Sequence, residues 1–117
     1  MTTAPEHHCP GCGARQKHFA RYPWHFCKDC RRLAETREGR ALAFTQPHAG
    51  GGFAFGHADE AARYEALGVV CLIHGRPAYV HEARFGGVVA EPIPDLPMAR
   101  PGVIDIRRGI PEGLEPI

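Results

Sequence analysis

The sequence predicts a small β-rich fold, either all-β or α+β, and three observations indicate it. The chain has 117 residues, enough for one small domain. It contains 14 Gly and 11 Pro, two residue types that disfavour long helices. Several short runs alternate between apolar and other residues, which is the pattern of half-buried strands. We therefore expect short strands joined by loops.

Two pairs of alternating runs predict two β-hairpins within residues 39–90. Residues 41–44 and 52–57 flank a loop rich in Gly, and residues 69–74 and 78–85 flank a second turn that contains Gly and Pro. Small hairpins bury little apolar surface, so a bound metal would help to stabilise a fold of this size.

Alternation also predicts the side chains that form a core between the hairpins. The candidates are Phe53, Phe55 and His57 on the first hairpin and Tyr79, His81, Ala83 and Phe85 on the second. Aromatic platforms that stack on single-stranded nucleic acid look similar in sequence. We favour the core, because the chain offers few other side chains to build one.

The rest of the chain is predicted to contain one short helix and a tail. The helix covers residues 59–67, where Asp59 can cap the first turn and Gly68 can end the last. Six of the 11 prolines lie after Glu91 and are expected to prevent regular pairing. Residues 91–117 are therefore predicted to be extended or disordered.

Four of the five cysteines form two closely spaced pairs. Cys9 and Cys12 make one C-x2-C motif, and Cys27 and Cys30 make a second one after 14 intervening residues. Two residues between thiolates allow a tight turn whose backbone amides can donate to the sulfurs. Two such turns can present four sulfurs at tetrahedral corners about 2.3 Å from Zn²⁺. These four cysteines are the predicted ligands of one structural zinc ion.

This motif resembles a zinc ribbon or treble-clef knuckle pair of the C-P-x-C-G kind, over about a quarter of the chain. The resemblance implies an N-terminal zinc ribbon packed on the two hairpins. The alternatives are an iron site similar to rubredoxin, two redox pairs, or four ordinary buried thiols. Against iron, Arg31 follows the second knuckle where rubredoxin-like sites have Gly. The expected division of the chain is a flexible leader (1–8), the ribbon (9–38), the hairpin domain (39–90) and the tail (91–117).

No catalytic residue is predicted. A closed set of four thiolates leaves no open coordination position for substrate or water. Cys71 and His74 resemble half of a second metal site, but residues three apart in a strand point to opposite faces. We expect Cys71 to be buried and His74 to lie on the polar face. The chain contains no Ser, which excludes serine hydrolase chemistry, and no small-molecule substrate is inferred.

Charge and aromatic residues indicate a nucleic-acid partner. The formal net charge is +1, but residues 1–40 carry eight basic and four acidic residues. Basic side chains can bind phosphate while aromatic rings stack on bases. The candidate nucleic-acid contacts are Arg15, Lys17, Arg21, Tyr22, Trp24, Arg31 and Arg32. Alternatively, Trp24 packs over the zinc site and the charges are simply solvated.

The second function that we consider is a protein–protein adaptor or accessory subunit. The free edge of a hairpin or the proline-rich tail would then serve as the docking strip. Such a protein would use its zinc site only to stabilise the fold.

The expected compartment is the cytoplasm. No apolar run approaches the roughly 18–20 residues needed to cross a bilayer, so we expect no membrane partner. The N-terminus lacks the basic and then apolar order of a signal peptide. Five cysteines without such a signal argue against a disulfide framework.

Overall fold

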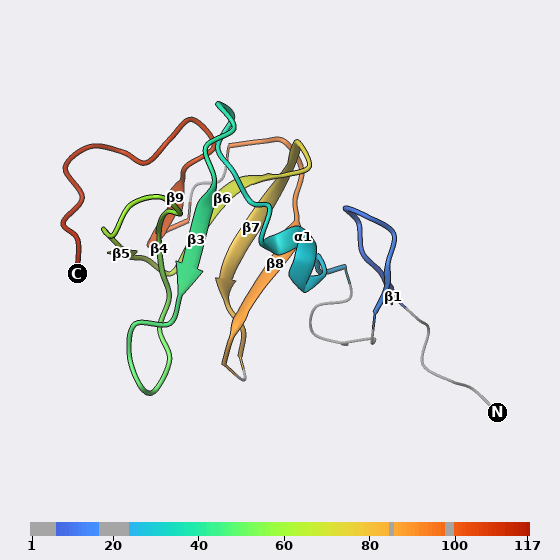
Figure 1. The fold of residues 1–117 in the computed structure, drawn as a ribbon, viewed down its shortest axis with the longest axis horizontal. Coiled ribbons are helices and arrows are strands. Elements are labelled where there is room, and N and C mark those ends of the chain that lie inside the picture. Colours follow the sequence, from blue (N-terminus) through green and yellow to red (C-terminus); the bar gives the residue numbers. More distant parts are fainter. Residues whose placement is uncertain (1–6, 17–23, 85, 98–99) are drawn as a thin grey trace.

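The computed structural model describes residues 7–16, 24–84, 86–97 and 100–117, and most of its regular elements are short β-strands (Figure 1). In chain order these elements are β1 (His7–His8), β2 (Arg15–Gln16), α1 (Lys28–Arg31), β3 (Leu42–Thr45), β4 (Ala54–His57), β5 (Tyr64–Glu65), β6 (Gly68–Ile73), β7 (Arg76–Glu82), β8 (Val88–Pro92) and β9 (Val103–Asp105). They form sheets with the strand orders β1-β2, β3-β4-β5 and β8-β7-β6-β9. The predicted β-rich class is confirmed.

The four-stranded sheet is built on the second predicted hairpin, β6 and β7, which pair antiparallel. A two-residue turn joins them at His74 and Gly75, whose φ angles are 52° and 74°. Tight hairpin turns of this kind need positive φ at both central residues, because only then does their twist match that of the strands. β8 adds antiparallel to β7, and β9 adds parallel to β6.

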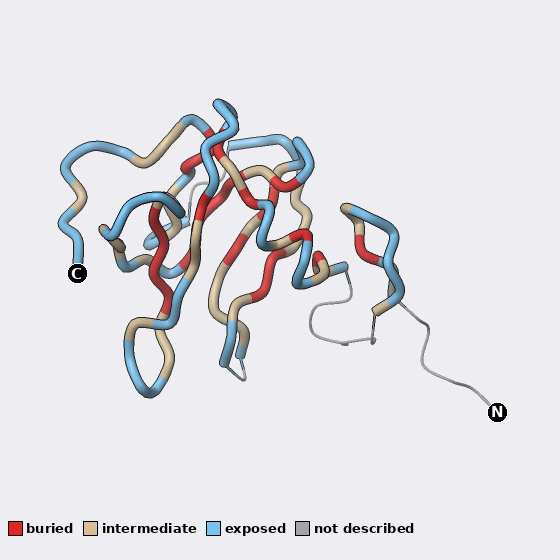
Figure 2. Tube along the Cα trace, in the orientation of Figure 1, coloured by how far each residue is buried: buried red, intermediate tan, exposed pale blue. Residues whose placement is uncertain are grey.

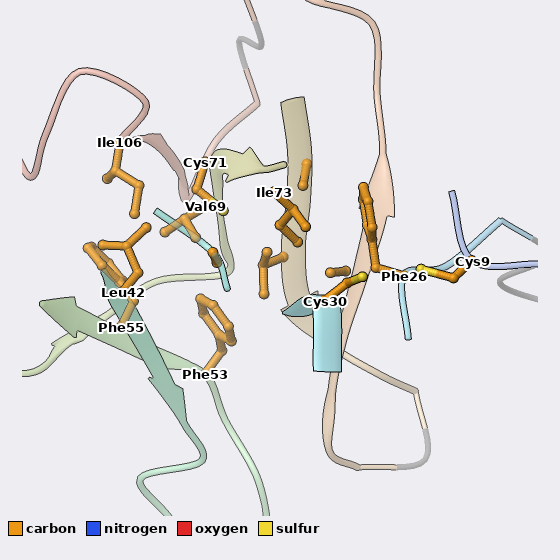
Figure 3. Packing of buried hydrophobic residues seen from close by; sticks show 14 residues of the cluster. Cys9, Phe26, Cys30, Leu42, Phe53, Phe55, Val69, Cys71, Ile73 and Ile106 are labelled. Carbon is orange, nitrogen blue, oxygen red and sulfur yellow. The ribbon is translucent and has the colours of Figure 1, made fainter. Parts of the chain in front are cut away.

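The core lies between this sheet and the three-stranded sheet, to which the first predicted hairpin contributes β3 and β4. Figure 2 shows buried stretches along the strands in the middle of the molecule. In Figure 3, Phe53 and Phe55 point toward the strand that carries Val69 and Cys71. The largest fully buried side chains are Phe55, Ile73, Ile106, Val69, Val70, Val80 and Cys71.

The core face of β7 is the opposite of the predicted one. Ala78 and Val80 are fully buried, whereas Tyr79 and His81 are only partly buried and stack on each other on the other face. The register explains this, because Ala78 pairs with the buried Cys71 and directly opposed residues share a face. Of the other predicted core residues, Phe53 and Phe55 are buried, whereas His57 and Ala83 are only partly buried. Phe85 lies outside the described residues.

The helix predicted for residues 59–67 is wrong, because the chain makes turns there and then forms β5. Tyr64 pairs with Phe55 on β4, and this tertiary pairing outweighs the weak helix propensity of a short segment. Gly56 allows the chain to approach closely, since a Cβ there would lie 2.3 Å from the Ala62 carbonyl oxygen. α1 has four residues, and no helix in the described ranges is long and apolar enough to cross a membrane.

Regular pairing also continues beyond Glu91, where the prolines were expected to prevent it. Residues 102–110 contain no proline, and within them β9 pairs with the central strand β6. Ile106 follows β9 and is fully buried. Arg107 is buried as well and donates to the carboxylates of Asp105 and Asp95. This part of the predicted tail therefore contributes to the sheet and to the core.

Candidate metal centre

The first cysteine pair lies on a tight turn closed by β1 and β2. The Cys9 amide donates to the Ala14 carbonyl at 2.8 Å, and the Gly13 amide donates to the Cys9 carbonyl at 2.9 Å. Gly13 has a φ of 79°, which glycine adopts without steric cost. This glycine lets the chain reverse direction immediately after Cys12.

The second cysteine pair lies at the start of α1. Cys27 is the residue before the helix, and its sulfur accepts a hydrogen bond from the Cys30 amide at 3.4 Å. Cys30 lies inside the helix and is 2% exposed. A helix of one turn is unstable by itself, so this cap and the surrounding contacts hold its shape.

The two turns bring the four predicted ligands together. The sulfurs of Cys9, Cys12, Cys27 and Cys30 all lie within 4.8 Å of one another. Ligands about 2.3 Å from a central ion stand about 3.8 Å apart in a tetrahedron, and the Cys12 and Cys27 sulfurs are separated by 3.7 Å. Four thiolates in this arrangement suit a soft or borderline cation. The described residues therefore include a cluster that could hold one metal ion.

Backbone amides prepare one of these sulfurs to ionise. The Cys9 sulfur accepts hydrogen bonds from the amides of Gly11 at 3.3 Å and Cys27 at 3.2 Å. Burial by itself raises the pKa of Cys9, but the backbone donors outweigh it and lower the pKa to about 7. Burial raises the pKa values of Cys27 and Cys30. Metal binding must therefore displace protons from these two thiols.

Contacts with β8 join the centre to the four-stranded sheet. The Phe26 amide donates to the Ala90 carbonyl at 2.8 Å, and the Arg31 guanidinium donates to the Val88 carbonyl. In Figure 3 the Phe26 ring lies at the end of the core nearest the cysteines. Phe26, Cys9 and Cys30 belong to the same buried cluster as the sheet residues. The cysteine centre is thus continuous with the hydrophobic core.

The β6–β7 turn approaches the centre from another side. His74 places its Nε2 atom 3.3 Å from the Cys30 sulfur. Two residues later, the Arg76 guanidinium donates to the Pro10 carbonyl, within the first knuckle, at 2.7 Å. His74 in the turn and Arg76 at the start of β7 therefore contact the second and the first knuckle, respectively.

The Trp24 side chain is largely exposed, at the edge of a groove beside the first knuckle. It is 68% exposed and borders an open groove of about 430 Å³ at the junction of the first knuckle and the sheet. The residues lining this groove are Pro10, Trp24, Arg76, Pro77, Pro92, Ile93 and Pro94. We call it the Trp24 groove.

The other predicted nucleic-acid contacts differ in their surroundings. Arg15 and Arg32 are exposed, and Arg32 lies 3.8 Å from the Asp29 carboxylate. Arg31 is partly buried, and its guanidinium binds the Val88 carbonyl. Arg31 therefore has a structural contact within the chain. The candidates outside the described residues are Lys17, Arg21 and Tyr22.

The contacts of His74 and Arg76 with the knuckles were not predicted from the sequence. The spacing of Cys71 and His74 drew attention to the turn, and the two residues do differ as expected, since Cys71 is fully buried and His74 is exposed. Burial, followed by the nearby charge of Asp105, raises the pKa of Cys71 to about 12, so this thiol resists ionisation. Nothing local in the sequence shows that the turn meets a knuckle more than 40 residues earlier.

Comparison of the chain with family models, curated proteins and solved structures finds no match. The class of this protein is therefore described from its fold and its cysteine site alone. It is a small β-rich protein with a four-cysteine centre that could hold a metal ion.

Proposed function

We propose that this chain is a non-enzymatic protein that binds one structural zinc ion and uses the adjacent surface to bind single-stranded nucleic acid. The approach of the four cysteine sulfurs to within 4.8 Å carries the zinc assignment. Zinc favours four-coordinate thiolate sites without geometric strain, and structural zinc sites are closed in this way. The ion would hold the two knuckles together.

Native mass spectrometry with elemental analysis of the protein, purified without added metal, tests the zinc assignment. We expect one zinc per chain. Cys12→Ala should lose zinc with little damage to the core, because Cys12 is the exposed member of the four. Cys71→Ala is the matched control and should keep zinc, since this buried cysteine lies outside the cluster. Iron in place of zinc, or a metal-free chain, would overturn the assignment.

The exposed Trp24 side chain supports the nucleic-acid partner. Stacking of a base on an aromatic ring contributes about 1–3 kcal/mol, and it needs an unpaired base whose face is accessible. The Trp24 groove is lined by the indole, by proline rings and by the cationic Arg76. Lys28 and Arg32 are exposed at α1 and can attract phosphates.

Binding of short single-stranded DNA and RNA to the zinc-loaded chain tests this partner. Trp24 is the single tryptophan, so its fluorescence reports directly on stacking. We expect the affinity to fall as salt rises. Trp24→Ala should weaken binding by about 10-fold or more, in line with the loss of one stacked base. Leu67→Ala is the control, since Leu67 is also 68% exposed but does not line the groove.

The proposal fails if the zinc-loaded chain binds neither single-stranded DNA nor single-stranded RNA at low salt. It also fails if Trp24→Ala and Leu67→Ala bind equally well.

The apolar lining of the Trp24 groove supports a second candidate, an adaptor that binds a protein segment there. Four prolines and Ile93 supply five of its seven lining residues. β8 lies at one end of its sheet, but its edge is a poorer docking strip. Phe26 and Arg31 already donate hydrogen bonds to two of its carbonyls, those of Ala90 and Val88. An adaptor would capture a protein partner in a Trp24-dependent manner that salt hardly affects. Pull-down with the wild type and Trp24→Ala distinguishes the two candidates.

A further inference from the structure

His74 has a left-handed backbone conformation, which is uncommon outside glycine. Its φ of 52° is the one positive value outside glycine in the described part of the chain. Gly, Asn and Asp are the usual residues at this position of a two-residue hairpin turn, and His, like Asn and Asp, enters the left-handed region more often than most residues with a side chain. A conformation of this kind persists only where surrounding contacts hold it, and it is often found at functional sites.

The contacts of His74 converge on the cysteine centre. Its Nε2 atom lies 3.3 Å from the Cys30 sulfur. Gly11 leaves the space for the ring, since a Cβ at Gly11 would lie 2.9 Å from His74 Cδ2. The bond from Arg76 to the Pro10 carbonyl holds the turn against the same knuckle.

The hydrogen-bonding partner of the Cys30 sulfur differs from those of the Cys9 and Cys27 sulfurs. Among the described residues, backbone amides donate to the sulfurs of Cys9 and Cys27. The hydrogen-bonding partner found beside the Cys30 sulfur is the Nε2 atom of His74. A metal-bound thiolate can only accept hydrogen bonds, so the Nε2 atom must carry the hydrogen in the metal-loaded centre. His74 thus supplies to Cys30 what the backbone supplies to the other two sulfurs.

We propose that His74 is a positioning residue that donates an N–H···S hydrogen bond to the Cys30 thiolate and thereby strengthens metal binding. The inference rests on the proposed metal site. The imidazole is not part of the group of ligand atoms within 4.8 Å, which places it outside the set of direct ligands. Hydrogen bonds to ligating atoms orient them and adjust their electron density, and their loss typically weakens metal binding about 10- to 100-fold.

The experiment uses the full chain loaded with Co²⁺, whose thiolate charge-transfer absorption reports on electron density at sulfur. The first variant is His74→Gly, which removes the donor and relieves the unfavourable φ. We expect it to bind Co²⁺ and Zn²⁺ about 10-fold more weakly in a chelator competition. This is the lower end of the 10- to 100-fold range, because His74 is exposed and water can partly replace its hydrogen bond. Its charge-transfer band should move to lower energy, because an unbonded thiolate is more electron-rich.

Two further variants separate donation from a purely structural role. His74→Gln keeps an N–H donor at a similar distance along the side chain and should restore most of the affinity and the wild-type band. His48→Gly removes an exposed histidine from the β3–β4 loop and should change neither readout.

The outcomes separate this inference from the proposed function. If the wild type binds neither metal, the metal site itself fails. If the wild type binds metal but His74→Gly matches it in affinity and in spectrum, the role of His74 is overturned. The same holds if His74→Gln behaves like His74→Gly.

Discussion

Gly11 shows at the scale of one residue how little free space surrounds the cysteine centre. A Cβ at this position would lie 2.9 Å from His74 Cδ2, 3.0 Å from the Cys30 sulfur and 3.2 Å from Phe26 Cδ1. Distances this short force neighbouring atoms to move, and each of these neighbours belongs to the centre or contacts it. The second residue between the first two cysteines therefore has to be small.

Gly11→Ala should destabilise the metal-loaded chain by about 1–3 kcal/mol, the usual cost of an added methyl group in a packed site. Thermal unfolding of the zinc-loaded protein measures this. Gly50→Ala is the matched control, because a Cβ at Gly50 meets nothing within 4 Å. Equal melting temperatures for the two variants would contradict the close packing described for Gly11.

At the scale of an element, an ion pair stabilises the end of β9. Arg107 is 7% exposed and donates to both carboxylate oxygens of Asp105 and to Asp95. The hydrogen bonds from Arg107 lower the pKa of Asp105 below its ordinary value of 3.8. A strand of three residues has few ladder bonds of its own, so this pair and the burial of Ile106 help to keep β9 beside β6.

Asp105→Asn should lower the free energy of unfolding near pH 7 by about 1–3 kcal/mol, because the buried Arg107 loses one of its two charged acceptors and keeps only Asp95. A lowered carboxyl pKa gives stability that is present above the ordinary value of 3.8 and is lost as the pH falls through the folded-state pKa. The difference between wild type and variant should therefore shrink in acid. Urea unfolding across this pH range measures it.

Asp29→Asn is the control for this prediction, because the Asp29 side chain is 91% exposed and lies 3.8 Å from Arg32. Exposed pairs contribute little, about 0–1 kcal/mol. A variant at Asp105 that loses no more stability than the one at Asp29 would show that the β9 ion pair is unimportant.

At the scale of the whole molecule, the sheets and the cysteine centre depend on different interactions. The two larger sheets have strand ladders and a core of apolar side chains, whereas the knuckles adjoin one end of that core through Cys9, Phe26 and Cys30 and depend further on the proposed zinc ion and on bonds to β8, His74 and Arg76. Figure 1 shows β1 apart from the sheets, beyond α1. The two parts should therefore respond differently to metal removal.

Chelation should increase hydrogen exchange in residues 9–16 and 24–32 before it affects β6 and β7. The physical reason is that the proposed zinc ion is the main cross-link between the knuckles, while the strands keep their ladders and their core. Exchange measured by mass spectrometry, with metal loss verified on the same sample, tests this. Unchanged protection of the knuckles after metal loss would contradict a structural role for the ion.

Local patterns in the sequence were sufficient to locate both hairpins and the cysteine cluster. A hairpin and a C-x2-C knuckle each arise from residues close together in the chain, so turn residues and spacing specify them. Local patterns predicted the wrong core face for β7 and a helix over residues 59–67, where the chain forms turns and β5. Alternation predicts two faces for a strand but cannot say which one meets the core, and that choice depends on pairing with β6.

The sequence by itself therefore determined the β-rich class, the hairpins and the four cysteines that lie together. Only the tertiary structure decided that β9 joins the central sheet, that Trp24 is exposed beside a groove, and that His74 meets Cys30. The physical reason is sequence separation. These contacts join segments more than 30 residues apart, and they form only once the sheets pack against each other and against the knuckles.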